Sequence, residues 1–123
     1  MKPLGQVGER LVEQKYLQDG FILLERNYIF PRGVQMGELD LIFSKANELV
    51  FVEVKARRNE KFGGPFEAVD INKQRKLVKT AKLYIHLHRQ YQDYDYRIDV
   101  AAVDIDNPDN PVIILVNAIE DVD

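Results

Sequence analysis

The sequence predicts a single mixed α/β domain over residues 1–123, with a five-stranded mixed sheet flanked by helices. Apolar residues recur at helical spacing in residues 4–18 and 71–90, and five shorter segments are dense in β-branched and aromatic residues. The expected order of elements is therefore α-β-β-β-α-β-β. A chain of this length buries about two-thirds of its unfolded surface and can fold alone.

The first helix is expected over residues 4–18. Its apolar stripe consists of Leu4, Val7, Leu11 and Leu17, with Val12 and Tyr16 at the flanks. Gly5 and Gly8 each weaken a helix by up to about 1 kcal/mol relative to alanine, which indicates close backbone packing or a later start of the helix. Glu9 and Glu13 lie one turn apart on the polar side.

The glycine of Asp19-Gly20 suits the left-handed position that follows a helix, so the first helix is expected to end there. Residues 21–30 are rich in Ile, Leu, Tyr and Phe and predict the first strand. Residues 31–37 are expected to form a loop that leads into the second strand.

A hairpin is expected from residues 37–43 and 49–57, joined by the polar turn 44–48. Side chains alternate along a strand with period two, so the third strand presents two different faces. One face carries Leu49, Phe51, Glu53, Lys55 and Arg57, and the other carries Val50, Val52, Val54 and Ala56. Apolar residues on both faces indicate a central strand that is covered on both sides.

An acid and a lysine, Glu53 and Lys55, thus project together from a largely buried strand, where an unpaired charge costs on the order of several kcal/mol. Asp40, on the neighbouring strand, can reach the same end of the sheet. Two carboxylates and an ammonium at one strand end indicate a magnesium site with a lysine beside it. A structural Glu53–Lys55 ion pair or an exposed strand face also fits, because Glu13-Gln14-Lys15 repeats the spacing within a helix.

Asp70 is expected to be the N-cap of a helix over residues 71–90. The apolar sector of this helix consists of Leu77, Val78, Ala81, Tyr84, Ile85 and His88. A second, narrower sector consists of Arg75, Lys79, Lys82, His86 and Arg89. Gln74 lies in the apolar sector near the helix start and should point toward the sheet, where either an active site or backbone groups would bond it. His86 and His88 are interpreted as structural.

Residues 58–65 are polar and glycine-rich, which fits either a mobile loop that closes over a ligand or a plain connector. Residues 96–105 and 112–119 predict the fourth and fifth strands, with a turn at 107–111. A third strand that is joined to the fourth through a helix forms a parallel crossover if both lie in one sheet.

Charge is unevenly distributed along the chain. The net charge is −3, but residues 53–89 carry ten basic and four acidic side chains, a net of +6. Residues 90–123 carry one basic and nine acidic side chains, a net of −8, which is best explained as a solvated face. The positive field beside Glu53 favours a polyanionic partner more than the net charge indicates.

The chain contains no cysteine, which excludes disulfides, iron–sulfur clusters and cysteine-based zinc sites and is compatible with a reducing compartment. It shows no charged-then-apolar leader and no apolar run near the ~18 residues that a membrane span requires. A cytoplasmic protein that does not enter the membrane is therefore expected.

Two segments of the hairpin resemble a known family. Gly-Glu-Leu-Asp-Leu-Ile at 37–42 is followed by Val-Phe-Val-Glu-Val-Lys-Ala-Arg at 50–57. The pair resembles the YraN-like bacterial family of the PD-(D/E)XK nuclease superfamily, which is similar to archaeal Holliday-junction resolvases. Further matching positions, in order along nearly the whole chain, are Gly5, Gly8-Glu9, Arg26-Asn27-Tyr28, Lys73-Gln74, Ala81, Arg97-Ile98-Asp99-Val100 and Asn117-Ala118.

The resemblance implies a restriction-endonuclease-like core and a Mg²⁺ site in which Mn²⁺ can substitute. Asp40 and Glu53 would coordinate the ion, with the backbone carbonyl of Val54 as a further ligand. Lys55 would orient or help deprotonate the attacking water and offset charge on the pentavalent phosphate.

The resemblance also extends to residues outside the hairpin. Glu9 matches a glutamate that resolvase-like members bring to the metal, although the helical pattern alone makes it a solvated residue. Gln74 would support the ligands or contact a phosphate. The residues that would hold the DNA backbone, each equally well explained as solvated surface charge, are Arg57, Arg58, Lys61, Lys73, Arg75 and Lys79.

The expected function is therefore that of a Mg²⁺-dependent endonuclease that hydrolyses phosphodiester bonds of structured or branched DNA. A homodimer is allowed by analogy with junction resolvases. One alternative is a nuclease-like module that binds nucleic acid or recruits a partner without cutting. Another is a protein-interaction domain that uses residues 112–116 as an exposed edge.

Overall fold

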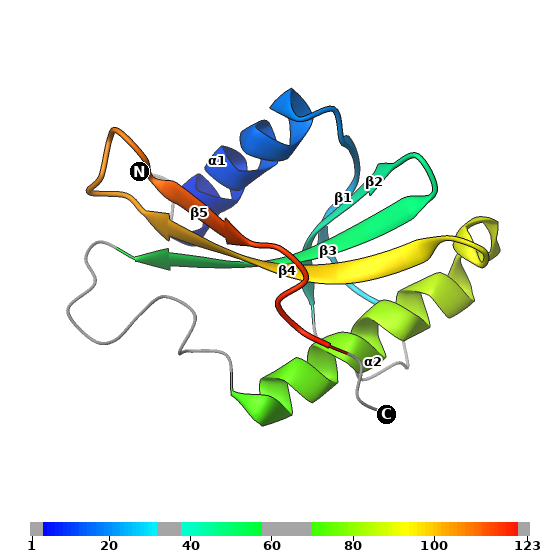
Figure 1. The fold of residues 1–123 in the computed structure, drawn as a ribbon. Coiled ribbons are helices and arrows are strands. Elements are labelled where there is room, and N and C mark those ends of the chain that lie inside the picture. Colours follow the sequence, from blue (N-terminus) through cyan, green and yellow to red (C-terminus); the bar gives the residue numbers. More distant parts are fainter. Residues whose placement is uncertain (1–3, 32–37, 58–69, 121–123) are drawn as a thin grey trace.

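One five-stranded sheet separates two helices in the computed structural model, which describes residues 4–31, 38–57 and 70–120. Helix α1 (Leu4–Gln18) covers one face of the sheet and helix α2 (Ile71–Leu87) covers the other (Figure 1). This arrangement confirms the predicted order of elements. The remaining elements are β1 (Ile22–Tyr28), β2 (Leu39–Lys45), β3 (Glu48–Arg57), the 3₁₀ turn η1 (Arg89–Tyr91), β4 (Asp95–Asp104) and β5 (Val112–Leu115).

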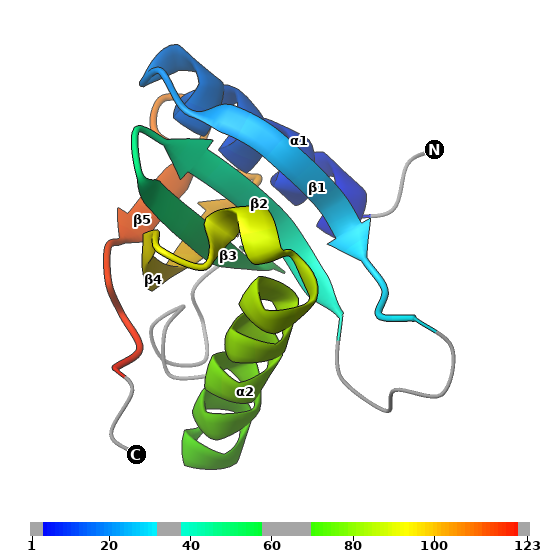
Figure 2. The same ribbon diagram turned by 90° about the vertical axis from the view of Figure 1, so that its right-hand side faces the viewer.

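The strands lie in the order β1-β2-β3-β4-β5, so β3 is the central strand. β3 and β4 are parallel, and every other neighbouring pair is antiparallel. The chain passes from β3 through α2 to β4, which is the long crossover that a parallel pair requires. The sheet is therefore mixed, as predicted. Seen from the side, β1 runs along α1, whereas α2 lies across the sheet from it (Figure 2).

Two separate cores fill the two faces of the sheet. Leu49 and Phe51 of β3 pack with Tyr84 in the cluster beneath α2. Val50 and Val52 belong to the cluster beneath α1. All four β3 side chains are at most 2 % exposed, so the prediction of a central strand covered on both sides is confirmed.

The face of α1 that contacts the sheet differs from the predicted stripe. Val12 and Tyr16 are 0 % and 3 % exposed, whereas Leu17 is 44 % exposed. Gly8, Val12 and Tyr16 recur every four residues and therefore form one contact line. Gly8 lies directly against Ala56 of β3, which confirms the predicted close packing there. Leu11 packs against the same core, as predicted, but the place of Leu17 in the stripe was wrong. The spacing of apolar residues does not show where the helix backbone approaches the sheet most closely.

Glu13 is only 6 % exposed, so its predicted place on the solvated side of α1 was wrong. Its carboxylate accepts two hydrogen bonds from the guanidinium of Arg26 on β1, one of them from Nη2 to Oε2 at 2.9 Å. These bonds and the positive charge of Arg26 hold the pKa of Glu13 below its usual value despite burial. The burial of Glu13 thus depends on a partner that lies in another element.

A second buried carboxylate, Asp99 of β4, is 0 % exposed and ties α1 to the end of β5. Its Oδ2 accepts a hydrogen bond from the hydroxyl of Tyr16 at 2.6 Å, and its Oδ1 accepts one from Arg97 Nε at 3.1 Å. The backbone N–H of Asn117 donates to the same Oδ1 at 2.8 Å, with a left-handed φ of 52°. β5 therefore ends at Leu115 rather than at the predicted residue 119, because the chain turns there toward Asp99.

Helix α2 begins as predicted and ends three residues early. The Asp70 side chain accepts a hydrogen bond from the backbone N–H of Lys73 at 2.8 Å, which makes it the N-cap. His88 leaves the helical conformation, with φ −121° and ψ 80°. Thr80 joins the buried face because its hydroxyl donates to the Lys76 carbonyl at 2.6 Å, which satisfies the polar group within the helix.

The β2–β3 hairpin is tighter than predicted. Lys45 pairs with Glu48, so Ala46 and Asn47 form a two-residue turn, and Ala46 has a φ of 52°. The predicted loops at 31–37 and 58–65 lie, except for residue 31, outside the described residues. Over residues 4–31, 38–57 and 70–120, no helix is long and apolar enough to cross a membrane.

Candidate active site

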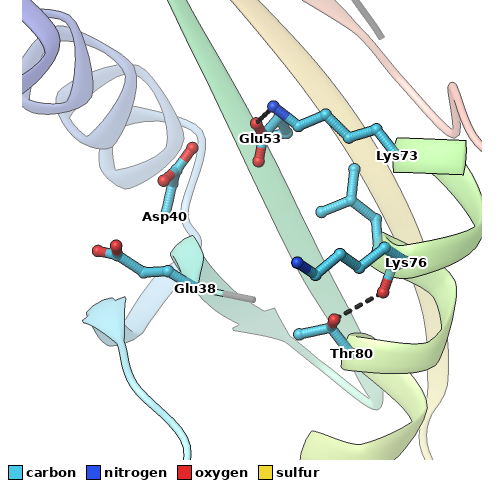
Figure 3. Close-up of a pocket in the computed structure, with 7 residues that line it drawn as sticks. Glu38, Asp40, Glu53, Lys73, Lys76 and Thr80 are labelled. Carbon is cyan, nitrogen blue, oxygen red and sulfur yellow. Dashed lines mark hydrogen bonds and ion pairs between the residues drawn. The ribbon is translucent and has the colours of Figure 1, made fainter. Parts of the chain in front are cut away.

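A pocket of about 280 Å³ opens where β2 and β3 face the first half of α2. Carboxylates project into it from the strands, and lysines project into it from the helix (Figure 3). The residues that line it are Glu38, Asp40, Glu53, Lys73, Lys76, Leu77 and Thr80. The topology brings these side chains together because the crossover from β3 returns α2 over the face of the sheet from which Glu53 projects.

Glu53 lines the pocket and is 7 % exposed. Its Oε1 is 2.8 Å from Nζ of Lys73 and 3.4 Å from Nζ of Lys55. The predicted Glu53–Lys55 proximity is therefore present, and a second lysine, from α2, lies closer still. Two ammonium groups on one buried carboxylate offset the cost of removing it from water.

Asp40 lies at the point where the β2–β3 ladder ends. The last register pair is Leu41 with Val52, and beyond it the backbone N–H of Val54 donates to Asp40 Oδ2 at 2.9 Å. A strand residue directs its N–H and its carbonyl to the same side. The Val54 carbonyl therefore faces the same edge as the Asp40 carboxylate.

Negative charge is concentrated around Asp40. Burial, followed by the charge of Glu53, raises the pKa of Asp40 to about 7, against the opposing hydrogen bond from Val54. Glu9 and Glu38 raise it further. A carboxyl group that is half protonated at neutral pH is typical of a functional site more often than of a structural one.

Glu9 of α1 belongs to the same electrostatic neighbourhood. Burial first, and then the charges of Glu38 and Glu53, raise the pKa of Glu9, while a hydrogen bond with Asn27 lowers it. Glu9 is half-buried and lies outside the lining of the pocket within the part of the chain that the structure describes. The resemblance implies that Glu9 reaches the metal, whereas the structure places Glu9 near the acids that line the pocket but not among them.

The two lysines that contact Glu53 are perturbed in opposite directions. Burial, together with contact and repulsion from Lys73, lowers the pKa of Lys55, although Glu53 opposes the shift. Burial also acts to lower the pKa of Lys73, but its hydrogen bond with Glu53 and the nearby negative charges outweigh this and raise it. Lys55 is therefore the ammonium that gives up its proton more readily.

The other predicted residues lie along α2 and β3. Gln74 is half-buried next to Lys73, but it is not among the described residues that line the pocket. Arg75 and Lys79 are exposed on α2, and Arg57 ends β3. Of the remaining basic residues that the sequence indicated, Arg58 and Lys61 lie outside the described residues, and Lys73 lies in the pocket.

Four residues that line the pocket were not predicted as site residues: Glu38, Lys76, Thr80 and Leu77, the last of which was predicted as part of the apolar sector of the helix. Glu38 carried a usable signal, since it lies two residues before Asp40 and strand alternation gives both the same side. Lys76 follows Lys73 by three residues, which places both on one helix face. Thr80 carried none, because its burial depends on how α2 rests on the sheet.

The donor set fits a magnesium ion. Asp40 and Glu53 supply carboxylate oxygens, Val54 supplies a carbonyl at the same edge, and the pocket has room for water. Magnesium prefers oxygen ligands in octahedral geometry, is bound through one or two carboxylates and keeps several waters. Among the residues that the structure describes, no group of three or more His, Cys, Asp or Glu side chains is arranged to hold an ion. An ion here would therefore rely on two carboxylates, a carbonyl and water.

Comparison with known proteins places the chain among bacterial relatives. The family model described as "Uncharacterised protein family UPF0102" matches residues 8–103. A UPF0102 protein of Caldanaerobacter subterraneus subsp. tengcongensis is 40% identical over 118 residues, which cover 96% of this chain and 92% of the relative. One of Stutzerimonas stutzeri is 39% identical over 80% of this chain and 79% of its own. One of Dictyoglomus thermophilum is 48% identical over 68% of each chain.

Proposed function

The chain belongs to the UPF0102 family, the YraN family that the sequence resembles, and from its pocket we propose that it is a Mg²⁺-dependent endonuclease. The proposed reaction is the hydrolysis of phosphodiester bonds in structured or branched DNA, and Mn²⁺ would substitute for Mg²⁺. The preference for branched DNA rests on the resemblance to junction resolvases.

The observation that carries the proposal is that Asp40 and Glu53 line one pocket and that Lys55, which does not itself line the pocket among the described residues, contacts Glu53. Glu53 contacts Lys55 at 3.4 Å, and the pKa of Asp40 is raised by the charge of Glu53 as well as by burial. Burying two carboxylates that repel each other in one pocket costs free energy, so a structural role alone does not explain the pair. Asp40 and Glu53 would hold Mg²⁺ at this edge, where the ion would supply Lewis-acid chemistry toward the phosphoryl oxygen and make the attacking water more acidic.

Lys55 is suited to the proton transfer and to charge stabilisation. Its pKa is lowered, so its amine can take a proton from water near neutral pH more readily than an ordinary lysine. As an ammonium, it stabilises the extra negative charge that develops on the phosphate during attack. The half-buried position on β3 fixes the amine relative to Glu53.

The basic residues of α2 and β3 support a nucleic-acid partner. Arg75 and Lys79 are exposed on α2, and Arg57 ends the strand that carries Glu53 and Lys55. Phosphate contacts by such residues are independent of sequence and sensitive to salt. Arg58 and Lys61 extend this basic run in the sequence. If two copies act together, a two-fold dimer would present two pockets to one branched substrate.

The test combines metal binding with cleavage. Calorimetric titration of Mg²⁺ and Mn²⁺ into the protein, and into Asp40→Asn and Glu53→Gln, should show binding that both substitutions abolish. A panel of four-way junction, flap, single-stranded and duplex DNA should then show cleavage that requires the divalent ion and is lost in Lys55→Ala. Unchanged metal binding in both carboxylate variants, or cleavage that survives Lys55→Ala, would refute the proposal.

A second candidate function is a nuclease-like fold that binds a partner without cutting. The observation in its favour is the edge strand β5, where Ile113 and Leu115 are 44 % and 45 % exposed, followed by Val116 at 56 %. An edge strand with exposed apolar side chains can pair with an added strand. Salt-sensitive DNA binding without divalent-ion binding, together with loss of partner capture in Ile113→Lys, would favour this function over hydrolysis.

A further inference from the structure

We infer that Lys73 is the internal counter-ion of the proposed metal site: its ammonium holds Glu53 while the divalent ion is absent and is displaced toward a DNA phosphate when the ion binds. The inference rests on the proposed function, because it needs a divalent ion at Glu53. Lys73 therefore has a positioning role that depends on whether the ion is bound. This role differs from the permanent contact with DNA that the resemblance implies.

The first support is the geometry of the ion pair. Lys73 Nζ lies 2.8 Å from Glu53 Oε1, a charge-assisted hydrogen bond, whereas Lys55 Nζ lies 3.4 Å from the same oxygen. The oxygen that would ligate a metal is therefore already bonded to a cation. Figure 3 shows the Lys73 side chain reaching from α2 across the pocket to Glu53.

The second support is the charge of the pocket. Glu53 is 7 % exposed, and Glu38 and Asp40 line the same pocket. Removing one partner from a buried ionic group is strongly destabilising, since the remaining charge is left without compensation. The metal-free protein thus needs a cation at Glu53, and the closest ammonium is that of Lys73.

The third support distinguishes Lys73 from Lys55. The Lys55 side chain is 22 % exposed and is fixed on the central strand. The Lys73 side chain is 38 % exposed and lies in the first turn of α2, so it has a path to solvent. A dication on Glu53 repels both ammonium groups, and the more exposed one can move away at lower cost. The Lys73 ammonium is therefore the one that is displaced from Glu53. It lies on the side of α2 that also carries Lys76.

Lys76 provides a matched control. It lies one turn further along α2 and lines the same pocket, but no ion pair between Lys76 and Glu53 is present among the described residues. A substitution of Lys76 removes the same charge from the same pocket without freeing Glu53. Any effect of general pocket charge will appear in both variants, and an effect of direct competition will appear only in the Lys73 variant.

The first measurement is calorimetric binding of Mn²⁺ and of Mg²⁺ without DNA. Lys73→Gln should bind the ion about threefold to tenfold more tightly than the parent, because the competing ion pair is gone. Lys76→Gln should stay within about twofold of the parent. Lys73→Arg, which keeps the cation, should bind no more tightly than the parent. Circular dichroism melting confirms that each variant is folded.

The second measurement is the salt dependence of DNA binding. With the divalent ion present, Lys73→Gln should reduce the slope of log affinity against log salt by about one relative to the parent. With EDTA, the slope should be unchanged, because Lys73 is then held by Glu53.

The outcomes separate the two proposals. If the parent binds the ion and Lys73→Gln binds it equally or more weakly, the inference about Lys73 is overturned and the metal site stands. If the DNA slope falls equally with and without the ion, Lys73 is a permanent phosphate contact and the displacement is wrong. If the parent binds neither ion, the proposed function falls, and the inference falls with it.

Discussion

A Cβ atom on Gly8 would lie 2.9 Å from the Cβ of Ala56, so α1 crosses β3 at a distance that only glycine permits. Two atoms of Val103 on β4 would lie 3.6 Å from the same Cβ. The backbone of α1 therefore touches the sheet at the end of β3 that follows Glu53 and Lys55. Glu9, the next residue along α1, is held near the acids of the pocket by this contact.

We predict that Gly8→Ala destabilises the protein by about 1–3 kcal/mol, because the added methyl group meets a fixed side chain in a packed interface. Gly5→Ala is the matched control in the same helix, since a Cβ at position 5 would meet nothing within 4 Å. That control should change stability by between zero and about 1 kcal/mol in the stabilising direction. Urea unfolding followed by circular dichroism measures both, and equal effects would contradict the close approach.

A second prediction concerns Asp40 in metal-free protein. Its pKa is raised from 3.8 to about 7 in the folded state, so folded protein binds more protons than unfolded protein between these values. Stability therefore falls as pH rises from about 4 to about 7 and then levels off. Asp40→Asn removes this dependence and should stabilise the protein at pH 8 by about 1–2 kcal/mol, with little difference at pH 4.

The measurement is urea unfolding in EDTA at pH 4, 6 and 8, taken as the difference between variant and parent. Asparagine keeps an oxygen that can accept the Val54 N–H, so the strand end is preserved. Asp109→Asn, in an exposed turn, serves as the control for the loss of one carboxylate. A difference that stays constant across the three pH values would show that Asp40 is not perturbed.

A third prediction concerns the buried carboxylate of Asp99. Tyr16→Phe removes the hydroxyl that donates to Asp99 at 2.6 Å and should cost about 1–3 kcal/mol, because a buried acceptor loses its partner. Tyr94→Phe is the control, since no hydrogen bond of the Tyr94 hydroxyl is present among the described residues. Thermal melting should separate the two variants by several degrees, and overlapping curves would mean that the hydroxyl of Tyr16 contributes nothing.

A fourth prediction concerns the exposed basic residues of α2. DNA affinity should fall steeply with salt, and Arg75→Gln and Lys79→Gln should each reduce the slope of log affinity against log salt by about one. Lys15→Gln, an exposed lysine on α1 at the opposite face of the sheet, should leave the slope unchanged. Fluorescence anisotropy with a labelled duplex, at salt concentrations from about 50 to about 300 mM, measures the slope for each variant. A flat dependence in the parent would remove DNA as the ligand.

The sequence predicted the strand half of the pocket better than the helix half. Asp40 and Glu53 lie in a hairpin, where alternation and a short turn determine which side chains meet. Lys73 reaches Glu53 only because the crossover returns α2 over that face of the sheet, a relationship between residues far apart in sequence. From the sequence, Lys73 was expected to have the same role as Lys79, a contact to the DNA backbone, and the match of Lys73-Gln74 to the family did not show that Lys73 would pair with Glu53.

The same limit explains the errors in α1. Helical periodicity placed Leu17 in the apolar stripe and Val12 at its flank, and only the approach at Gly8 decides that Val12 is buried and Leu17 exposed. Glu13 has the local pattern of a surface acid because Arg26, its partner, lies on a strand. Contacts within one hairpin were predictable, whereas the partners that α1 and α2 find on the sheet were not.

The hydrogen bond from the Val54 N–H to the Asp40 carboxylate links the backbone of β3 directly to the pocket. Any event that changes the electron density on that carboxylate, such as loss of its proton or arrival of an ion, alters the magnetic environment and the deuterium exchange of a single main-chain hydrogen. Val54 is thus a native spectroscopic reporter, placed where it can follow the occupancy of the centre without a label.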